Sequence, residues 1–107
     1  MIRTVLYRKN GQSSGFSSSG HAGAGEYGYD IVCSAVSALT VNTANAVEAL
    51  TGAKFSEQLD EEGGFLEFHL MDLDNHDAQL LLKALELGLR QISESYPENL
   101  MILEDGD

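Results

Sequence analysis

The chain reads as two successive units in which a β-hairpin pattern precedes a long helical pattern, and this order constrains the fold more than any other feature. Strand-forming side chains fill 2–8, and Asn10-Gly11 is a strong signal for a tight hairpin turn. A polar return strand is expected over 15–19, followed by a helix over about 31–51. The expected core stripe of that helix consists of Val32, Val36, Leu39, Thr43, Ala46, Val47 and Leu50.

The second unit repeats the scheme. Two alternating segments, 55–59 and 66–70, flank a turn at 61–64 and predict a hairpin with one buried face. A helix should start near Asp74 or Asn75 and end before Pro97. Its expected core stripe consists of Ala78, Leu81, Leu82, Leu85, Leu89, Ile92 and Tyr96. A short last strand is expected at 101–103.

These elements predict an α+β fold with the order ββαββαβ. We expect an antiparallel-rich sheet with two long helices on one face, forming a single domain over 1–107. A chain of 107 residues is long enough for one hydrophobic core and too short for two.

Composition limits the classes of function. The formal charge is −11, from 17 acidic and 6 basic residues, which argues against direct binding of nucleic acid, because phosphate contacts need a basic surface. The start of the chain does not resemble a leader, and no apolar run approaches the roughly 18 residues of a membrane span. We therefore expect a cytoplasmic protein. A single cysteine cannot form an internal disulfide or a cysteine-rich metal site, and we expect no metal and no cofactor.

The one cysteine, Cys33, lies in a context suited to thiol chemistry. Asp30 stands where a helix N-cap is expected, so Cys33 would fall in the first helical turn, beside free N–H groups. His21 precedes it in a glycine-rich loop that is long enough to bring the imidazole to the sulfur. A helix N-terminus and a nearby histidine both favour a thiolate, and the imidazole can take the thiol proton. Ser37 lies one helical turn beyond Cys33, on the same side of the helix.

Other interpretations of these residues stay open at this stage. A lone cysteine in a helix is usually a small buried hydrophobe, and a loop histidine is usually just solvated. The chain could instead be a non-catalytic acidic adaptor that binds basic proteins, or a redox sensor that uses Cys33. A redox sensor, however, has no evident need for a loop histidine.

Two motifs together resemble the ribosomal-processing cysteine protease family. They are Ser19-Gly20-His21-Ala22-Gly23 and Gly28-Tyr29-Asp30-Ile31-Val32-Cys33-Ser34-Ala35-Val36-Ser37. Either motif alone would be a weak signal, but both in one chain of this length are specific. The remaining elements also fit the family over nearly the whole chain.

This resemblance implies a bacterial, cytoplasmic, homodimeric endopeptidase. Its substrate would be the precursor of ribosomal protein L-twenty-seven, whose short N-terminal extension is removed after an apolar, aromatic-rich segment. The resemblance implies that Cys33 is the nucleophile and His21 the general base, with Asp30 and Ser37 as supporting polar residues. The substrate loop would consist of Gly20, Ala22, Gly23, Gly25 and Gly28 around His21.

The second helix also bears on the homodimer. Leu80 and Leu87 lie beside its core stripe and add more apolar surface than one small domain needs. We expect them to pack against a second copy of the chain, since an isologous contact is the commonest way to bury such a surface. The alternative is that both leucines lie in the core of the monomer.

Overall fold

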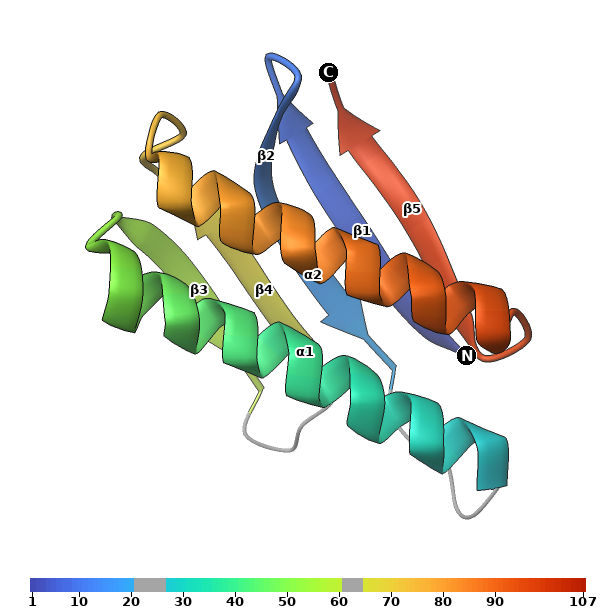
Figure 1. Cartoon of the computed structure of the whole chain (residues 1–107). Helices are drawn as coiled ribbons and strands as arrows, with labels where there is room; N and C mark the ends of the chain where they lie inside the picture. Colours follow the sequence, from blue (N-terminus) through green and yellow to red (C-terminus); the bar gives the residue numbers. More distant parts are fainter. Residues whose placement is uncertain (21–26, 61–64) are drawn as a thin grey trace.

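In the computed structural model the chain forms a five-stranded sheet covered by two helices (Figure 1). The structure describes residues 1–20, 27–60 and 65–107, and for 27–30 it describes the course of the helix without side chains. The elements are β1 (Ile2–Lys9), β2 (Gln12–Ser19), α1 (Tyr27–Thr51), β3 (Phe55–Leu59), β4 (Phe65–Leu70), α2 (His76–Ser95) and β5 (Leu100–Gly106). The predicted order ββαββαβ is confirmed.

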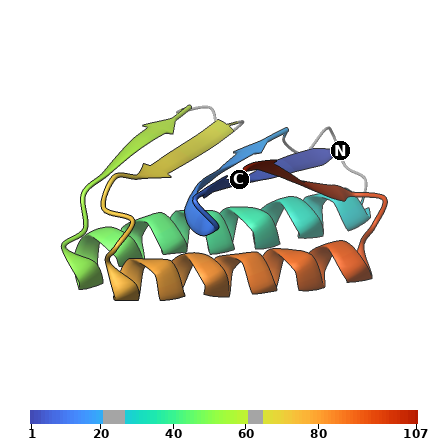
Figure 2. The ribbon, with the colours of Figure 1, turned by 90° about the horizontal axis from the view of Figure 1, so that it is seen from above.

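The strands follow the order β3-β4-β2-β1-β5 across the sheet. Three neighbouring pairs, β1–β2, β2–β4 and β3–β4, are antiparallel, whereas β5 pairs with β1 in parallel. Both helices lie on the same face of this sheet (Figure 2). The α+β class, the antiparallel-rich sheet and the one-sided helices are therefore as the sequence predicts. Within the described residues, no helix is long and apolar enough to cross a membrane.

The first hairpin is tighter than the sequence predicts. Asn10 and Gly11 both have positive φ, 54° and 76°, as a type I′ turn requires. β2 therefore begins at Gln12, immediately after the turn, and not at Gly15. Pairing with β1 on one side and β4 on the other outweighs the weak strand propensity of its serines. At Gly15 a Cβ atom would overlap the Phe68 carbonyl oxygen, so this strand position accepts only glycine.

Helix α1 begins earlier than the sequence predicts. It starts at Tyr27, so the prediction that Asp30 is its N-cap is wrong, and Gly28 belongs to the helix and not to the loop. The error has a physical cause. An aspartate is favourable at the cap and equally in the first turn, where its charge meets the positive end of the helix dipole. A glycine that early in a helix also costs less than one in its middle.

The core lies between the sheet and the two helices. From α1 it takes Val32, Val36 and Val47, which belong to the predicted stripe, and also Ala44, which does not. Leu50, however, is 73% exposed, and its assignment to the core is wrong. The last turn of α1 extends past the first turn of α2 in both views, so α2 does not run alongside this end of α1 (Figures 1 and 2).

Helix α2 follows its sequence signals closely. Asn75 caps it, because its Oδ1 accepts a hydrogen bond from the Ala78 amide at 2.9 Å. The residues that it buries are Ala78, Leu82, Leu85 and Leu89. Tyr96 is the C-cap and is 38% exposed, so its place in the core stripe is wrong. At φ −133° and ψ 63° its backbone has left the helix, and its side chain no longer follows the helical spacing.

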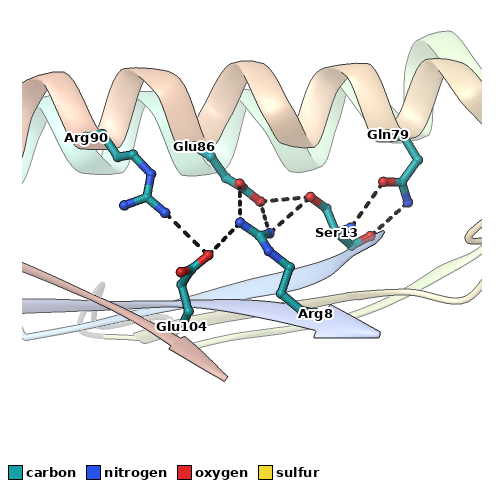
Figure 3. A network of polar contacts seen from close by, with 6 residues as sticks. All are labelled: Arg8, Ser13, Gln79, Glu86, Arg90 and Glu104. Carbon is teal, nitrogen blue, oxygen red and sulfur yellow. Dashed lines mark hydrogen bonds and ion pairs between the residues drawn. The ribbon is translucent and has the colours of Figure 1, made fainter. Parts of the chain in front are cut away.

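A network of hydrogen bonds and ion pairs joins α2 to β1, β2 and β5 (Figure 3). Arg8, at the end of β1, donates to both carboxylate oxygens of Glu86 on α2 and to Glu104 on β5. The Ser13 hydroxyl donates to Glu86 Oε2 at 2.8 Å. The Gln79 side chain donates to the Ser13 carbonyl and accepts from its amide. Arg8 lies near one end of β1 and Ile2 at the other, and Ile2 lines a pocket. The polar network and the pocket are therefore at opposite ends of β1.

Candidate active site

Cys33 lies in the second turn of α1, with its thiol free and its side chain half-buried. Its neighbour Val32 and, one turn on, Val36 are fully buried and anchor this part of the helix on the sheet. Cys33 packs against the edge of that core, as predicted. Because α1 begins at Tyr27, Cys33 stands beyond the four residues whose N–H groups lack partners within the helix. The expected help from the helix terminus is correspondingly weaker.

Cys33 opens into a pocket of about 200 Å³ between α1 and the strand ends. The helix contributes Cys33, Val36, Ser37, Thr40 and Val41. The strands and their ends contribute Ile2, Ser18, Gly20, Leu59, Phe65 and Leu66. The pocket therefore combines one nucleophile and two hydroxyl groups of serine with a mainly apolar wall. Such a combination suits a ligand with an apolar side chain and a polar main chain.

The polar groups of the pocket differ in what they can offer a ligand. Ser37 is exposed and Ser18 half-buried, so both hydroxyl groups can reach a ligand. The buried Thr40 hydroxyl instead donates to the Val36 carbonyl at 2.9 Å. That bond holds the hydroxyl against the helix backbone, so Thr40 adds bulk to the pocket and not a free polar group. Ser37 is the polar residue of α1 that accompanies Cys33, as its spacing predicts.

The main chain leaves β2 at this same pocket, one residue before the predicted base, His21. Gly20 follows the last residue of β2, lines the pocket, and has φ 90°. A Cβ atom there would lie 2.8 Å from the Met1 carbonyl oxygen, so a larger residue would clash with the main chain. His21 follows directly, but it lies outside the described residues, as do Ala22, Gly23 and Gly25. Asp30 stands in the first turn of α1 without a described side chain.

The structure thus brings Cys33, Ser37 and Gly20 to one pocket, and adds residues that the sequence analysis missed. Among these, Val41 continues the line of Cys33 and Ser37 by one more turn and is 42% exposed, which is unusual for a valine with no partner. Leu59 and Phe65 flank the predicted turn at 61–64, which lies outside the described residues. The apolar side chain of Val41 at an exposed position of α1 was a signal that could have identified it as a pocket residue. Leu59 and Phe65 gave no such signal, since only the packing of the sheet brings them to the helix.

The two histidines that the structure describes lie on different elements, His69 on β4 and His76 at the start of α2. In the described part of the chain, no three histidine, cysteine, aspartate or glutamate side chains gather in a group suited to a metal ion.

Comparison with known sequences matches residues 1–101 to the family described as cysteine protease Prp. Among curated proteins, the ribosomal processing cysteine protease Prp of Staphylococcus aureus is 39% identical over 83 residues, covering 78% of both chains. The protein of the same name from Bacillus subtilis is 32% identical over 107 residues, covering 95% of this chain and 96% of the relative.

Solved structures agree with the sequence comparisons. The S. aureus protease Prp in complex with a substrate peptide gives a TM-score of 0.91 at 32% identity, covering 98% of this chain and 100% of that one. The same protease with a covalently linked product peptide gives 0.89 at 33% identity, with the same coverage. A crystal structure of a Streptococcus mutans protein gives 0.91 at 37% identity, covering 100% of this chain and 96% of that one.

The family model spans nearly the whole chain, and the fold agrees with those of the protease structures. The chain therefore belongs to the cysteine protease Prp family and is a cysteine-type peptidase.

Proposed function

We propose that this peptidase removes the short N-terminal extension of the precursor of ribosomal protein L-twenty-seven during maturation of the large ribosomal subunit. The observation that carries the proposal is the position of the chain's one thiol, Cys33, at the mouth of an apolar pocket that also holds Ser37. A relative that shares the fold carries a covalently linked product peptide, which is the kind of adduct that a nucleophilic thiol forms.

In the proposed reaction the Cys33 sulfur attacks the carbonyl carbon of the scissile peptide bond. His21 takes the thiol proton as general base and later gives it to the leaving amine. The thioester that remains is hydrolysed by water, which releases the extension with a new carboxylate and restores the thiol. Gly20 lines the pocket, and His21 is the next residue in the chain, which supports this role for His21.

Asp30 and Ser37 are proposed as supporting residues. Ser37 reaches the pocket beside Cys33 and is exposed, so its hydroxyl can bond the main chain of a bound peptide. Asp30 precedes Cys33 by about one helical turn, which places both residues on the same side of α1. Gly20, Ala22, Gly23 and Gly25 are proposed as the substrate loop, since residues with little or no side chain let a peptide approach closely.

The character of the pocket favours the proposed substrate. Val36, Val41 and Leu59 give it an apolar wall, and its volume of about 200 Å³ suits one large apolar side chain. A net charge of −11 also favours encounter with a basic ribosomal protein, because opposite charges accelerate association. Cleavage after an aromatic-rich segment fits this combination.

The proposal includes a cytoplasmic homodimer. Leu80 and Leu87 are 59% and 62% exposed on α2, so the alternative that they belong to the monomer core does not hold. Two exposed leucines on one helix are what a self-association surface needs. The cytoplasm is where ribosomal subunits mature in bacteria, and the proposed substrate is found there.

Incubation with a synthetic peptide that spans the extension junction, followed by mass spectrometry, tests the proposal. We expect one cut after the aromatic segment with the native protein and none with Cys33→Ala. Ser34→Ala, which alters the exposed neighbour of Cys33, serves as the matched control and should cut normally. A non-catalytic adaptor would bind the peptide and leave it whole, and that result would overturn the proposal.

A further inference from the structure

Strand β3 is an outer strand of the sheet and ends at the pocket that holds Cys33. Among the strands that the structure describes, it pairs with β4 alone. Four of its five residues are exposed, Ser56 through Leu59. Leu59, the last of them, lines the pocket although 57% of it is exposed. An open strand edge of this kind can accept another extended chain.

The register shows which groups of β3 are free to do so. The Asp60 amide donates to the Phe65 carbonyl, and the Met71 amide donates to the Lys54 carbonyl. In an antiparallel ladder the residues that bond to the partner alternate with those that point away from it. Since Lys54 and Asp60 bond toward β4, so do Ser56 and Gln58 between them. The N–H and C=O groups of Phe55, Glu57 and Leu59 therefore point outward, away from the sheet.

The same alternation relates this edge to the pocket. Phe55, Glu57 and Leu59 turn their side chains toward the helix layer, because their partners Leu70, Phe68 and Leu66 are the buried residues of β4. A strand added beside β3 would place every second side chain toward the same layer. The added residue next to Leu59 would then face the pocket wall formed by Leu59 and Val41.

Charge indicates what sort of segment fits. Glu57 on β3 and Glu48 on α1 are exposed, and neither forms an ion pair with any other residue that the structure describes. An added strand with a basic residue near Glu57 would supply the missing countercharge. A second copy of this acidic chain would instead bring like charges together.

We propose that the peptide substrate binds as an additional strand along the free edge of β3, with an apolar side chain in the Cys33 pocket and a basic residue near Glu57. The proposal rests on the proposed function, because it assigns the binding mode of that same substrate. It makes Glu57 a specificity-determining residue through both its amide and its carboxylate. Main-chain pairing explains how one small pocket can serve an enzyme that must recognise several residues in a row.

A scan of substrate peptides with the unaltered protein gives the sharpest test. Each amide of the junction peptide is N-methylated in turn, and kcat/KM is measured for every peptide. Because strand pairing uses the amides of alternate residues, we expect losses of about tenfold at every second position on one flank of the scissile bond. Peptides methylated at the intervening positions should be cut nearly as well as the parent.

Two variants of Glu57 then separate the contribution of its main-chain amide from that of its side-chain charge. Glu57→Pro removes an outward amide without removing a bond to β4, and proline is tolerated at such edge positions. Glu57→Ala keeps the amide and removes the charge. We expect Glu57→Ala to raise KM, and its difference in KM from the native protein should shrink as salt is added. Glu57→Pro should raise KM further than Glu57→Ala at any salt concentration. Circular dichroism and thermal unfolding of both variants verify that they are folded.

The possible outcomes are distinguishable. If the parent peptide is not cut, the proposed function fails. If it is cut but the methylated peptides show no alternation, and Glu57→Pro matches Glu57→Ala, substrate does not bind along β3 and this inference is overturned while the peptidase remains.

Discussion

The Arg8 guanidinium donates to both carboxylate oxygens of Glu86, with 2.6 Å from Nη1 to Oε2 and 2.7 Å from Nη2 to Oε1. This bidentate pair joins the end of β1 to the middle of α2, which are far apart in the chain. The side chains are only 21% and 13% exposed, so the charges interact in a medium less polar than water.

Glu86→Gln should therefore lower the free energy of unfolding by about 2 kcal/mol, since it removes the less exposed of the two carboxylates that pair with Arg8 and leaves the guanidinium with the exposed Glu104. Urea denaturation followed by circular dichroism measures this loss. Glu104→Gln is the matched control, because Glu104 contacts the same guanidinium but is 53% exposed. Its cost should stay below about 1 kcal/mol. Equal costs would show that burial does not govern the pair.

The same carboxylate should make stability depend on pH. Burial alone would raise the pKa of Glu86, but hydrogen bonds from Arg8 and Ser13 and the nearby positive charges outweigh it, and the net pKa lies below 4.5. A lowered folded-state pKa contributes stability that is present above the unfolded value and is lost as the pH falls through the folded one. The stability difference between native protein and Glu86→Gln should be full near pH 7 and shrink below about pH 4.5. Urea titrations at pH 7 and pH 3 test this, and a constant difference would contradict it.

Replacement of the proposed general base should stop most of the catalysis and leave the fold intact. We expect His21→Ala to lower kcat by about a hundredfold or more, because the thiol then has no base to take its proton. Stopped assays on the junction peptide measure the rate, and thermal unfolding measures the fold. His76→Ala is a matched control at the exposed start of α2 and should cut normally. A His21→Ala protein that cuts at the native rate would remove His21 from the mechanism.

The apolar wall of the pocket should determine affinity for the substrate. Val41→Asp places a carboxylate beside the side chain that the pocket receives, and we expect KM for the junction peptide to rise about tenfold or more. Leu50→Asp makes the same kind of change on α1 at a site 73% exposed and outside the pocket. It should leave both KM and kcat unchanged. Similar effects of the two variants would indicate a general electrostatic cause and not the pocket.

Self-association through α2 is a separate prediction. Light scattering at micromolar concentration should report twice the 11.6 kDa mass of one chain. The double variant Leu80→Glu with Leu87→Glu should report a single chain, because it places charge on the two exposed leucines. Leu50→Glu with Met71→Glu places the same charge on two exposed apolar residues outside α2 and should stay dimeric. A native protein with the mass of one chain would refute the homodimer.

The local signals in the sequence determined the elements of the fold and their order. Asn10-Gly11 demands a tight turn because both residues tolerate positive φ, and Asn75 caps α2 through a bond to its own first turn. The alternation in β4 and the helical spacing of the buried leucines in α2 indicated which faces are buried. Each of these features acts between residues that are close in the chain. Local sequence therefore sufficed to predict them.

Tertiary structure alone decided the rest. The parallel pairing of β5 with β1, the antiparallel pairing of β2 with β4 and the meeting of Cys33 with Leu59 and Phe65 all join distant segments. The predicted start of α1 was also wrong, since an aspartate such as Asp30 is favourable on either side of a helix boundary and did not reveal that the helix begins at Tyr27. The sequence placed Cys33 and Ser37 on one side of a helix because their spacing is local. The pocket wall around them depends on how the sheet packs against α1. That packing joins segments distant in the chain, so no local sequence pattern predicts it.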